Sequence, residues 1–153
     1  MREVKRYPQV PGFSQEELSN FLNQPLLARL STLNPNGTIH TIPIWYEYRD
    51  GIIFLSTQTI TQKVKNIERQ PQVTVLVDTN TMPYKGVMIY GTAELDFEDA
   101  VTKRVSIFER YIGSHGEAYA HQLAAKWEPV IIQVTPTRIV SFDYTKGSLV
   151  PNN

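Results

Sequence analysis

Two lysines at the start of a short predicted helix are the residues of this chain best placed to bind an anion. Lys63 and Lys65 follow Thr61 and Gln62, and Pro71 ends the helix. Thr61 is a suitable N-cap. A helix start has unpaired backbone N–H groups and a partial positive charge, which favour a phosphate. The lysines and the nearby hydroxyl strengthen that preference, so we expect a phosphate site here.

An apolar, aromatic strand precedes this helix in the chain. Pro43, Ile44 and Trp45 belong to it, and Ser56 and Thr57 end the next strand shortly before the helix begins. An aromatic surface beside a phosphate-binding helix start suits a phosphorylated aromatic cofactor. Two structural readings stay open: Trp45 in a hydrophobic core, and Ser56 and Thr57 as ordinary polar groups at a strand end.

Turn residues and β-branched residues divide the rest of the chain into strands with few helices between them. Asn34 to Gly37 and Asp50-Gly51 are turns. The predicted strands cover residues 26–33, 38–48, 52–56, 72–78, 86–97, 130–134 and 139–144, with helices near 61–69, 98–112 and 116–126. This order predicts a mainly β protein, about six antiparallel strands in a split barrel, which leaves few exposed edges. We expect a single domain over residues 1–153.

The composition excludes several classes of function. The chain has 153 residues with 15 basic and 15 acidic side chains, so no overall field attracts nucleic acid or a membrane. It contains no cysteine, which excludes disulfides and thiolate chemistry. The polar start lacks the apolar core of a signal peptide, so we expect a cytoplasmic protein. An oligonucleotide-binding barrel is a rival, since exposed tyrosines could stack bases, but it needs a basic groove.

The three histidines do not form a metal site. His40 lies in a predicted strand, while His115 and His121 are six residues apart and therefore do not share a helix face. We expect no metal.

In order and spacing, several short motifs resemble the pyridoxamine 5′-phosphate oxidase-like flavoproteins, the FMN-binding split-barrel family. The similarity runs from about residue 26 to residue 144 and is greatest to the small members that include deazaflavin-dependent enzymes. The matching motifs are Ala28-Arg29-Leu30-Ser31-Thr32, Pro43-Ile44-Trp45, residues 54–57, Lys63-Val64-Lys65-Asn66-Ile67 with Pro71, Gly91-Thr92-Ala93-Glu94, and Pro136 with Phe142.

The resemblance implies a homodimer with two flavin sites at the subunit interface, each taking FMN or, alternatively, a deazaflavin coenzyme. By position, the backbone of Pro43, Ile44 and Trp45 would line the isoalloxazine ring. Ser56 and Thr57 would lie along the ribityl chain.

The same resemblance assigns the phosphate to the helix start. Thr61, Gln62 and Lys63 would hold it, with Lys65 assisting. The strand around Gly91 would contribute contacts from the other subunit. From the residues alone, Gly91 is equally well explained as a kink that helps close the barrel.

Two departures from the family pattern bear on function. Gln62 stands where better-known oxidases have an arginine, which removes a bidentate phosphate donor. An Arg-x-His element is also missing near the carboxyl end, where Arg138 is followed two residues later by Val140. We therefore expect an FMN-dependent oxidoreductase for a small organic substrate that is not an efficient pyridoxamine phosphate oxidase. The alternatives are a deazaflavin-dependent reductase and a non-catalytic flavin-binding protein.

Overall fold

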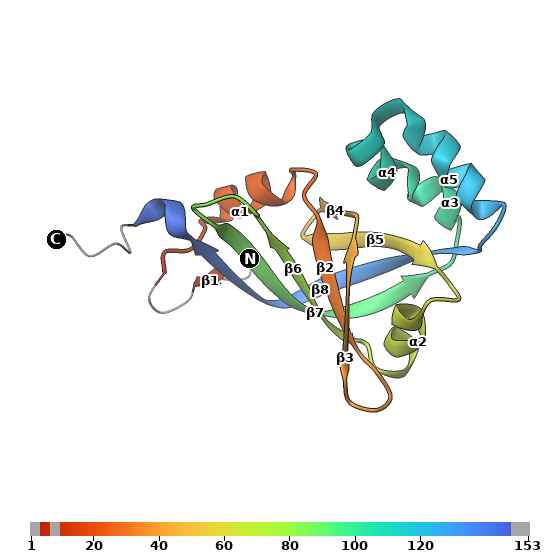
Figure 1. Cartoon of the computed structure of the whole chain (residues 1–153), viewed down its shortest axis with the longest axis horizontal. Coiled ribbons are helices and arrows are strands. Elements are labelled where there is room, and N and C mark those ends of the chain that lie inside the picture. Colours follow the sequence, from red (N-terminus) through yellow and green to blue (C-terminus); the bar gives the residue numbers. More distant parts are fainter. Residues whose placement is uncertain (1–3, 7–9, 148–153) are drawn as a thin grey trace.

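The structure is a computed structural model that describes residues 4–6 and 10–147. Its strands and helices follow one another along the chain as Figure 1 labels them. In order they are β1 (Val4–Arg6), α1 (Gln15–Leu22), β2 (Ala28–Leu33), β3 (Ile39–Ile44), β4 (Tyr46–Arg49), β5 (Ile52–Gln58), α2 (Gln62–Arg69), β6 (Gln72–Asp78), β7 (Lys85–Asp96), α3 (Ala100–Lys103), α4 (Val105–Ile112), the 3₁₀ turn Gly113–His115, α5 (Gly116–Ala124), β8 (Pro129–Asp143) and the 3₁₀ turn Tyr144–Lys146.

One sheet, curled on itself, makes the body of the protein. Its strand order is β3-β2-β6-β7-β8-β5-β4, and β1 pairs in parallel with β8 beside this path. The first and last strands of the path, β3 and β4, are consecutive in the chain and are separated only by Trp45. The chain itself therefore joins the two edges of the curled sheet, which makes it a split barrel, as predicted.

The path has seven strands, against about six expected, and the strand bounds differ from the prediction at two places. The predicted strand over residues 38–48 breaks at Trp45, so that β3 pairs with β2 while β4 pairs with β5. At the other end of the chain, the two strands predicted over 130–134 and 139–144 form one long strand, β8. A bulge allows this: Tyr90 pairs with Arg138 and Gly91 with Pro136, so Thr137 is the extra residue.

Alternation of side chains along β5 separates the barrel interior from the outer surface. Ile53, Leu55 and Thr57 are buried on one face, and Ser56 and Gln58 are half-buried on the other. Residues from every main-path strand and from α1 and α2 fill the interior core. The opposite face of β5 is the one available to a ligand.

Three helices form a separate layer outside the barrel, beside β4 and β5 (Figure 1). We call α3, α4 and α5 the helical cap. The helix predicted over 98–112 is interrupted at Arg104, which separates α3 from α4. The cap has its own apolar cluster, which includes Ile107, Phe108 and Ala120 together with Ile131 of β8. Across the described ranges, no helix has the length and apolar character needed to cross a bilayer.

Candidate functional site

A pocket lies between the barrel and the helical cap, and it contains four of the predicted site residues. Its volume is about 360 Å³, within the usual range for small-ligand sites. We call it the cap pocket. The barrel contributes Leu27, Pro43, Ile44, Trp45, Ser56 and Gln58, and the cap contributes Phe108, Tyr119 and Leu123.

Trp45 is both a wall of this pocket and part of the cap cluster. Its indole stacks on the Tyr111 ring with 4.7 Å between centroids and 5° between planes. Phe108 meets it edge to face at 5.6 Å. Two cap aromatics therefore fix the orientation of Trp45, which packs against the cap cluster and lines the pocket. Its role beside a cofactor stays a prediction.

Tyr111 also supplies hydrogen bonds where the strand breaks. The backbone N–H of Tyr46 donates to the Tyr111 hydroxyl at 3.0 Å, and that hydroxyl donates to the Leu26 carbonyl at 2.7 Å. Beside it, Arg110 Nε donates to the Tyr46 carbonyl at 3.0 Å. Backbone groups next to a strand break need such partners. Helix α4 thus holds the chain in the bend that presents Trp45 to the pocket.

Ser56 provides a buried polar group in this pocket that is not used within the described part of the chain. Its Oγ is buried and has no hydrogen-bond partner among the described residues. A buried hydroxyl without a partner is unfavourable, so this atom is suited to a ligand that can donate or accept. Thr57 points to the opposite face of β5, where its Oγ1 lies 3.5 Å from Thr61 Oγ1.

The predicted phosphate site follows directly from the end of β5. The carbonyl of Gln58, a pocket residue, accepts hydrogen bonds from the backbone N–H of Thr61 at 3.2 Å and from Thr61 Oγ1 at 2.9 Å. Thr61 is the N-cap of α2, as predicted, but its side chain makes no capping hydrogen bond to the helix. The first backbone N–H groups of α2 are therefore not capped by this side chain.

Lys63 is half-buried in the first turn of α2. Burial lowers the pKa of its ammonium group because desolvation disfavours the charged form. Within the described ranges, its ammonium group has neither an ion pair nor a hydrogen bond. A phosphate would supply the missing negative charge. Lys65, by contrast, is exposed.

Asn66 is a functional candidate that the sequence reasoning did not single out. Its buried side chain donates to Thr32 Oγ1 at 3.0 Å and to Asn34 Oδ1 at 2.9 Å. It also accepts from Gln62 Nε2 at 2.9 Å. These bonds attach α2 to the end of β2 and the following turn. The two acceptors, Thr32 and Asn34, are more than 30 residues away, so sequence spacing around Asn66 could not indicate them.

Two predicted site residues lie in other hollows. Gln62 lines a hollow of about 450 Å³ together with His40, Asn34, Pro35 and Asn36. Gly91 lines a hollow of about 530 Å³ on the outside of β2, β6 and β7. We call this second one the outer hollow. A Cβ at Gly91 would lie 2.6 Å from the Thr135 carbonyl oxygen, so close packing of β7 on β8 already requires glycine there.

The combined arrangement suits a cofactor that brings its own chemistry. An aromatic slot with one unused hydroxyl adjoins a helix start with an unpaired lysine. Within residues 4–6 and 10–147, no group of three or more histidine, aspartate or glutamate side chains could hold a metal ion. The site binds and orients a ligand more readily than it performs acid–base chemistry by itself.

The sequence matches one family model over residues 14–142, described as pyridoxamine 5′-phosphate oxidase. The chain belongs to this family. The split barrel, the position of α2 and the family match all agree with the resemblance found in the sequence motifs. No curated protein matches the sequence.

Solved structures extend the likeness to most of the chain. A conserved hypothetical protein of Mycobacterium tuberculosis, Rv2991, is 28% identical, with a TM-score of 0.78 over 92% of this chain and 90% of that one. A protein named F420 reductase is 23% identical, with a TM-score of 0.65 over 79% of this chain and 94% of that one. An FAD-binding protein of Mesorhizobium loti is 19% identical, with a TM-score of 0.60 over 86% and 93%. The likeness of this chain to the F420 reductase and to the FAD-binding protein is a likeness of fold.

Proposed function

We propose that this protein binds FMN and transfers electrons between the flavin and a small organic substrate. The observation that carries the proposal is the continuity of two half-sites. The cap pocket, with the unpartnered Ser56 hydroxyl, leads through Gln58 and Thr61 to the unpaired Lys63 at the start of α2. An aromatic slot followed by an anion site matches a flavin ring followed by its phosphate.

Each residue has a role that follows from its surroundings. Pro43, Ile44 and Trp45 would pack against the flavin ring, and Ser56 would hydrogen-bond to the cofactor. Lys63 and the backbone N–H groups of α2 would bind the phosphate. When bound, the flavin supplies the redox chemistry, while the protein provides binding, orientation and exclusion of water. Helix α4 would keep Trp45 in place through Tyr111.

A deazaflavin coenzyme is the second candidate, supported by the F420 reductase among the structures of similar fold. Its longer anionic tail would require additional cations beside Lys63. Lys65 is exposed and available, but Arg69 already donates to Asn66 Oδ1 and to the Leu33 carbonyl. This commitment of Arg69 favours the shorter FMN.

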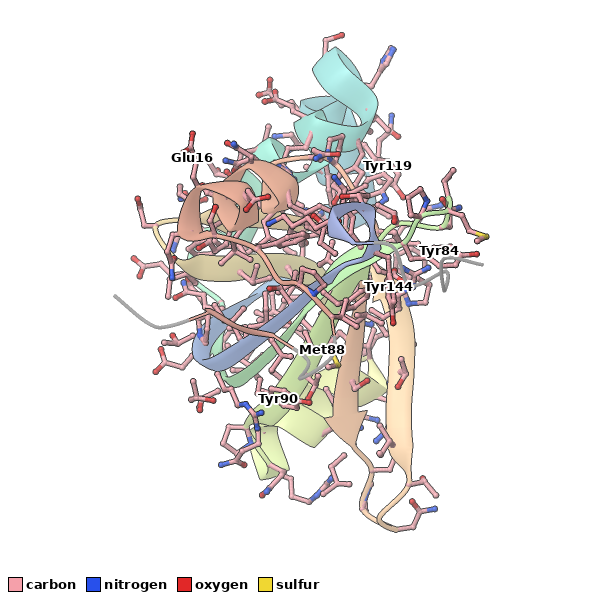
Figure 2. The ribbon with its side chains drawn as sticks, turned by 90° about the vertical axis from the view of Figure 1, so that its left-hand side faces the viewer. Glu16, Tyr84, Met88, Tyr90, Tyr119 and Tyr144 are labelled. Atoms are coloured by element: carbon pink, nitrogen blue, oxygen red, sulfur yellow. The ribbon has the colours of Figure 1, made fainter. Side chains whose placement is uncertain are left out.

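We also propose a homodimer in which the partner subunit completes the site. The outer hollow is lined by Leu33, Ile39 and Tyr90, whose apolar side chains are substantially exposed, and it includes Gly91. Figure 2 shows Tyr90 beside Met88 on the face of β7 that lies away from the helical cap. Ile39 is also on β3, a strand at one end of the sheet path. Covering such a surface with a second copy would bury apolar area.

The absorption spectrum of freshly purified protein tests the cofactor assignment. Oxidised FMN gives a yellow spectrum with two visible bands, whereas a deazaflavin gives a single band at shorter wavelength. Titration of FMN and of the deazaflavin coenzyme into protein stripped of ligand then ranks the two. Failure to bind either cofactor would refute the proposal. Binding without turnover of any substrate would identify a flavin-binding protein without catalysis.

A further inference from the structure

Arg104 is an arginine enclosed in the helical cap without a counter-charge. It joins α3 to α4, and its exposed fraction is 0%. Nη2 donates to the Ala120 carbonyl of α5. Nε and Nη1 have no hydrogen-bond partner, and no carboxylate pairs with the guanidinium, in the part of the chain that the structure describes.

This arrangement is unfavourable for the protein alone. Burial removes the guanidinium from water, and one hydrogen bond to a carbonyl does not replace that hydration. Consistent with this, desolvation lowers the pKa of Arg104. An apolar side chain of similar volume would serve a purely structural role better. The arginine is therefore better explained by a negatively charged ligand that enters the cap.

The guanidinium lies directly behind the cap wall of the cap pocket. Its Cζ is 5.4 Å from the centroid of the Phe108 ring, and Phe108 packs on Tyr119 at 5.2 Å. Both aromatic residues line the pocket. The Tyr119 side chain is close enough to influence the titration of Arg104. Tyr119 is 38% exposed, and its hydroxyl has no hydrogen-bond partner among the described residues. Turning Tyr119 aside would therefore break no hydrogen bond.

We propose that Arg104 binds the carboxylate of an organic substrate whose apolar part lies in the cap pocket. This rests on the proposed function, because the substrate would lie between the flavin and the cap. One guanidinium balances the single negative charge of a carboxylate, whereas a phosphate ester carries closer to two. The unpartnered nitrogens can donate charge-assisted hydrogen bonds to the carboxylate oxygens. Arg104 is thus the residue that selects carboxylic acids over neutral compounds of the same shape.

Benzoate and benzamide test this selection because they have almost the same shape and differ in charge. Each is titrated into the FMN-loaded protein at constant ionic strength, and the shift in the visible flavin spectrum reports binding. We expect benzoate to bind at least tenfold more tightly than benzamide. Arg104→Met should reduce this preference to twofold or less. Lys126→Met, which removes an exposed cation near the end of α5, should leave it unchanged. Equal binding of the two probes to the wild type would overturn the proposal.

Two further measurements separate a binding role from a structural one. The unfolding temperature of Arg104→Met should be no lower than that of the wild type, since a buried unpaired charge is removed. A lower temperature with the benzoate preference intact would overturn the proposal. Arg104→Gln, whose amide can still donate to the Ala120 carbonyl, is the second replacement in case the methionine variant does not fold, and it should also lose the preference. Tighter binding of phenyl phosphate than of benzoate would overturn the assignment to carboxylates.

The proposal that the protein binds FMN and the proposal that Arg104 binds a carboxylate can be refuted independently of each other. Arg104→Met should bind FMN as the wild type does, because the guanidinium lies on the cap side. If the wild type binds no FMN, the proposed function fails. Benzoate and benzamide are then titrated into the cofactor-free Trp127→Phe variant. The chain has two tryptophans, so the fluorescence of Trp45 reports binding in this variant. A benzoate preference that depends on Arg104 would sustain the carboxylate site by itself.

Discussion

At the scale of single residues, the site is distinguished by polar groups that have no partner in the described part of the chain. Lys63 and the Ser56 hydroxyl lie at opposite ends of the short segment from β5 to α2. Most buried polar groups in native proteins are satisfied internally. Unpaired groups along one short segment therefore indicate the length and polarity of a ligand better than any single motif does.

Lys63→Ala should weaken FMN binding about ten- to hundredfold. A charge-assisted hydrogen bond contributes about 1.5–3 kcal/mol, and each 1.4 kcal/mol is about tenfold in the dissociation constant. Lys65→Ala should have a smaller effect because Lys65 is exposed. Quenching of flavin fluorescence during titration measures all variants, with Lys126→Ala as the control. Equal affinities of Lys63→Ala and the control would mean that the phosphate binds elsewhere.

The affinity for FMN should decline at alkaline pH through Lys63. Its pKa is lowered by burial, so without ligand the ammonium loses its charge at a lower pH than an ordinary lysine. Below that pH the charged amine attracts the phosphate, and above it the attraction is lost. The dissociation constant should therefore begin to rise at a pH below the usual lysine pKa of 10.5.

Lys63→Arg is the matched control for this pH dependence, because a guanidinium stays charged throughout. Ionisation of the flavin itself affects both proteins equally and cancels in the comparison. Identical pH profiles for the two proteins would contradict a role for the Lys63 charge.

At the scale of elements, helix α4 controls the shape of the site from outside the barrel. Arg110 and Tyr111 are adjacent and both contact the Tyr46 backbone at the break between β3 and β4. Arg110 also reaches the Asn23 and Gln24 carbonyls after α1. One helix thus links the cap, the strand break and the end of α1. Tyr111 takes part in both the strand break and the stacking of Trp45.

Tyr111→Phe should destabilise the fold by about 1–3 kcal/mol while it retains the stack on Trp45. The loss of the hydroxyl leaves the Tyr46 N–H without its partner at the break. Denaturant unfolding, followed by Trp45 fluorescence in a Trp127→Phe background, measures the change. Tyr84→Phe, at an exposed position, is the control and should alter the free energy of unfolding little. An unchanged stability of Tyr111→Phe would show that water can replace the hydroxyl.

At the scale of the whole molecule, the outer hollow is a surface with exposed apolar side chains. Ile39 is 71% exposed at the end of β3, and Tyr90 faces the same hollow. Exposed apolar residues beside an end strand favour association with another chain.

Ile39→Lys should weaken the proposed dimer and FMN binding together. A charge at the centre of an apolar contact is costly to bury, so we expect at least a tenfold rise in the dimer dissociation constant by sedimentation at micromolar concentration. Phe97→Lys removes a comparably exposed apolar residue outside the outer hollow and serves as control. A monomeric wild type that binds FMN would refute the shared site.

Turnover of pyridoxamine or pyridoxine 5′-phosphate should be poor in spite of the family name. Arg138 is exposed on β8 with its guanidinium over the Tyr90 ring, and Val140, two residues later, is buried. The valine side chain of Val140 therefore cannot serve beside Arg138 as a second group that binds a phosphate. Steady-state kinetics at saturating FMN should give kcat/KM below about 10⁴ M⁻¹s⁻¹, the lower end of the usual enzymatic range. A higher value for either compound would contradict this expectation.

The sequence by itself determined those features that depend on neighbouring residues. Turn residues, the Thr61 cap, the alternation along β5 and the order of strands and helices are set by local backbone preferences and side-chain periodicity. They were sufficient to predict a split barrel. The resemblance to a known family selected Pro43, Ile44, Trp45 and Ser56, which line one pocket. The break at Trp45 escaped prediction because it depends on Tyr111, 66 positions away.

Only the tertiary structure decided which polar groups have partners. Among the described residues, Asn66 finds partners in β2 and the following turn. In the same part of the chain, the Ser56 hydroxyl, the Lys63 ammonium group and two guanidinium nitrogens of Arg104 have no hydrogen-bond partner. The cap wall of the pocket likewise comes from helices that follow the barrel wall by about 50 residues or more. The burial of a side chain and its hydrogen-bond partners depend on contacts between segments that are distant in the sequence. Residue types and their spacing therefore do not predict them. The fold could therefore be predicted from the sequence. The chemistry of the site could be described only from the tertiary structure, in which the distant segments are in contact.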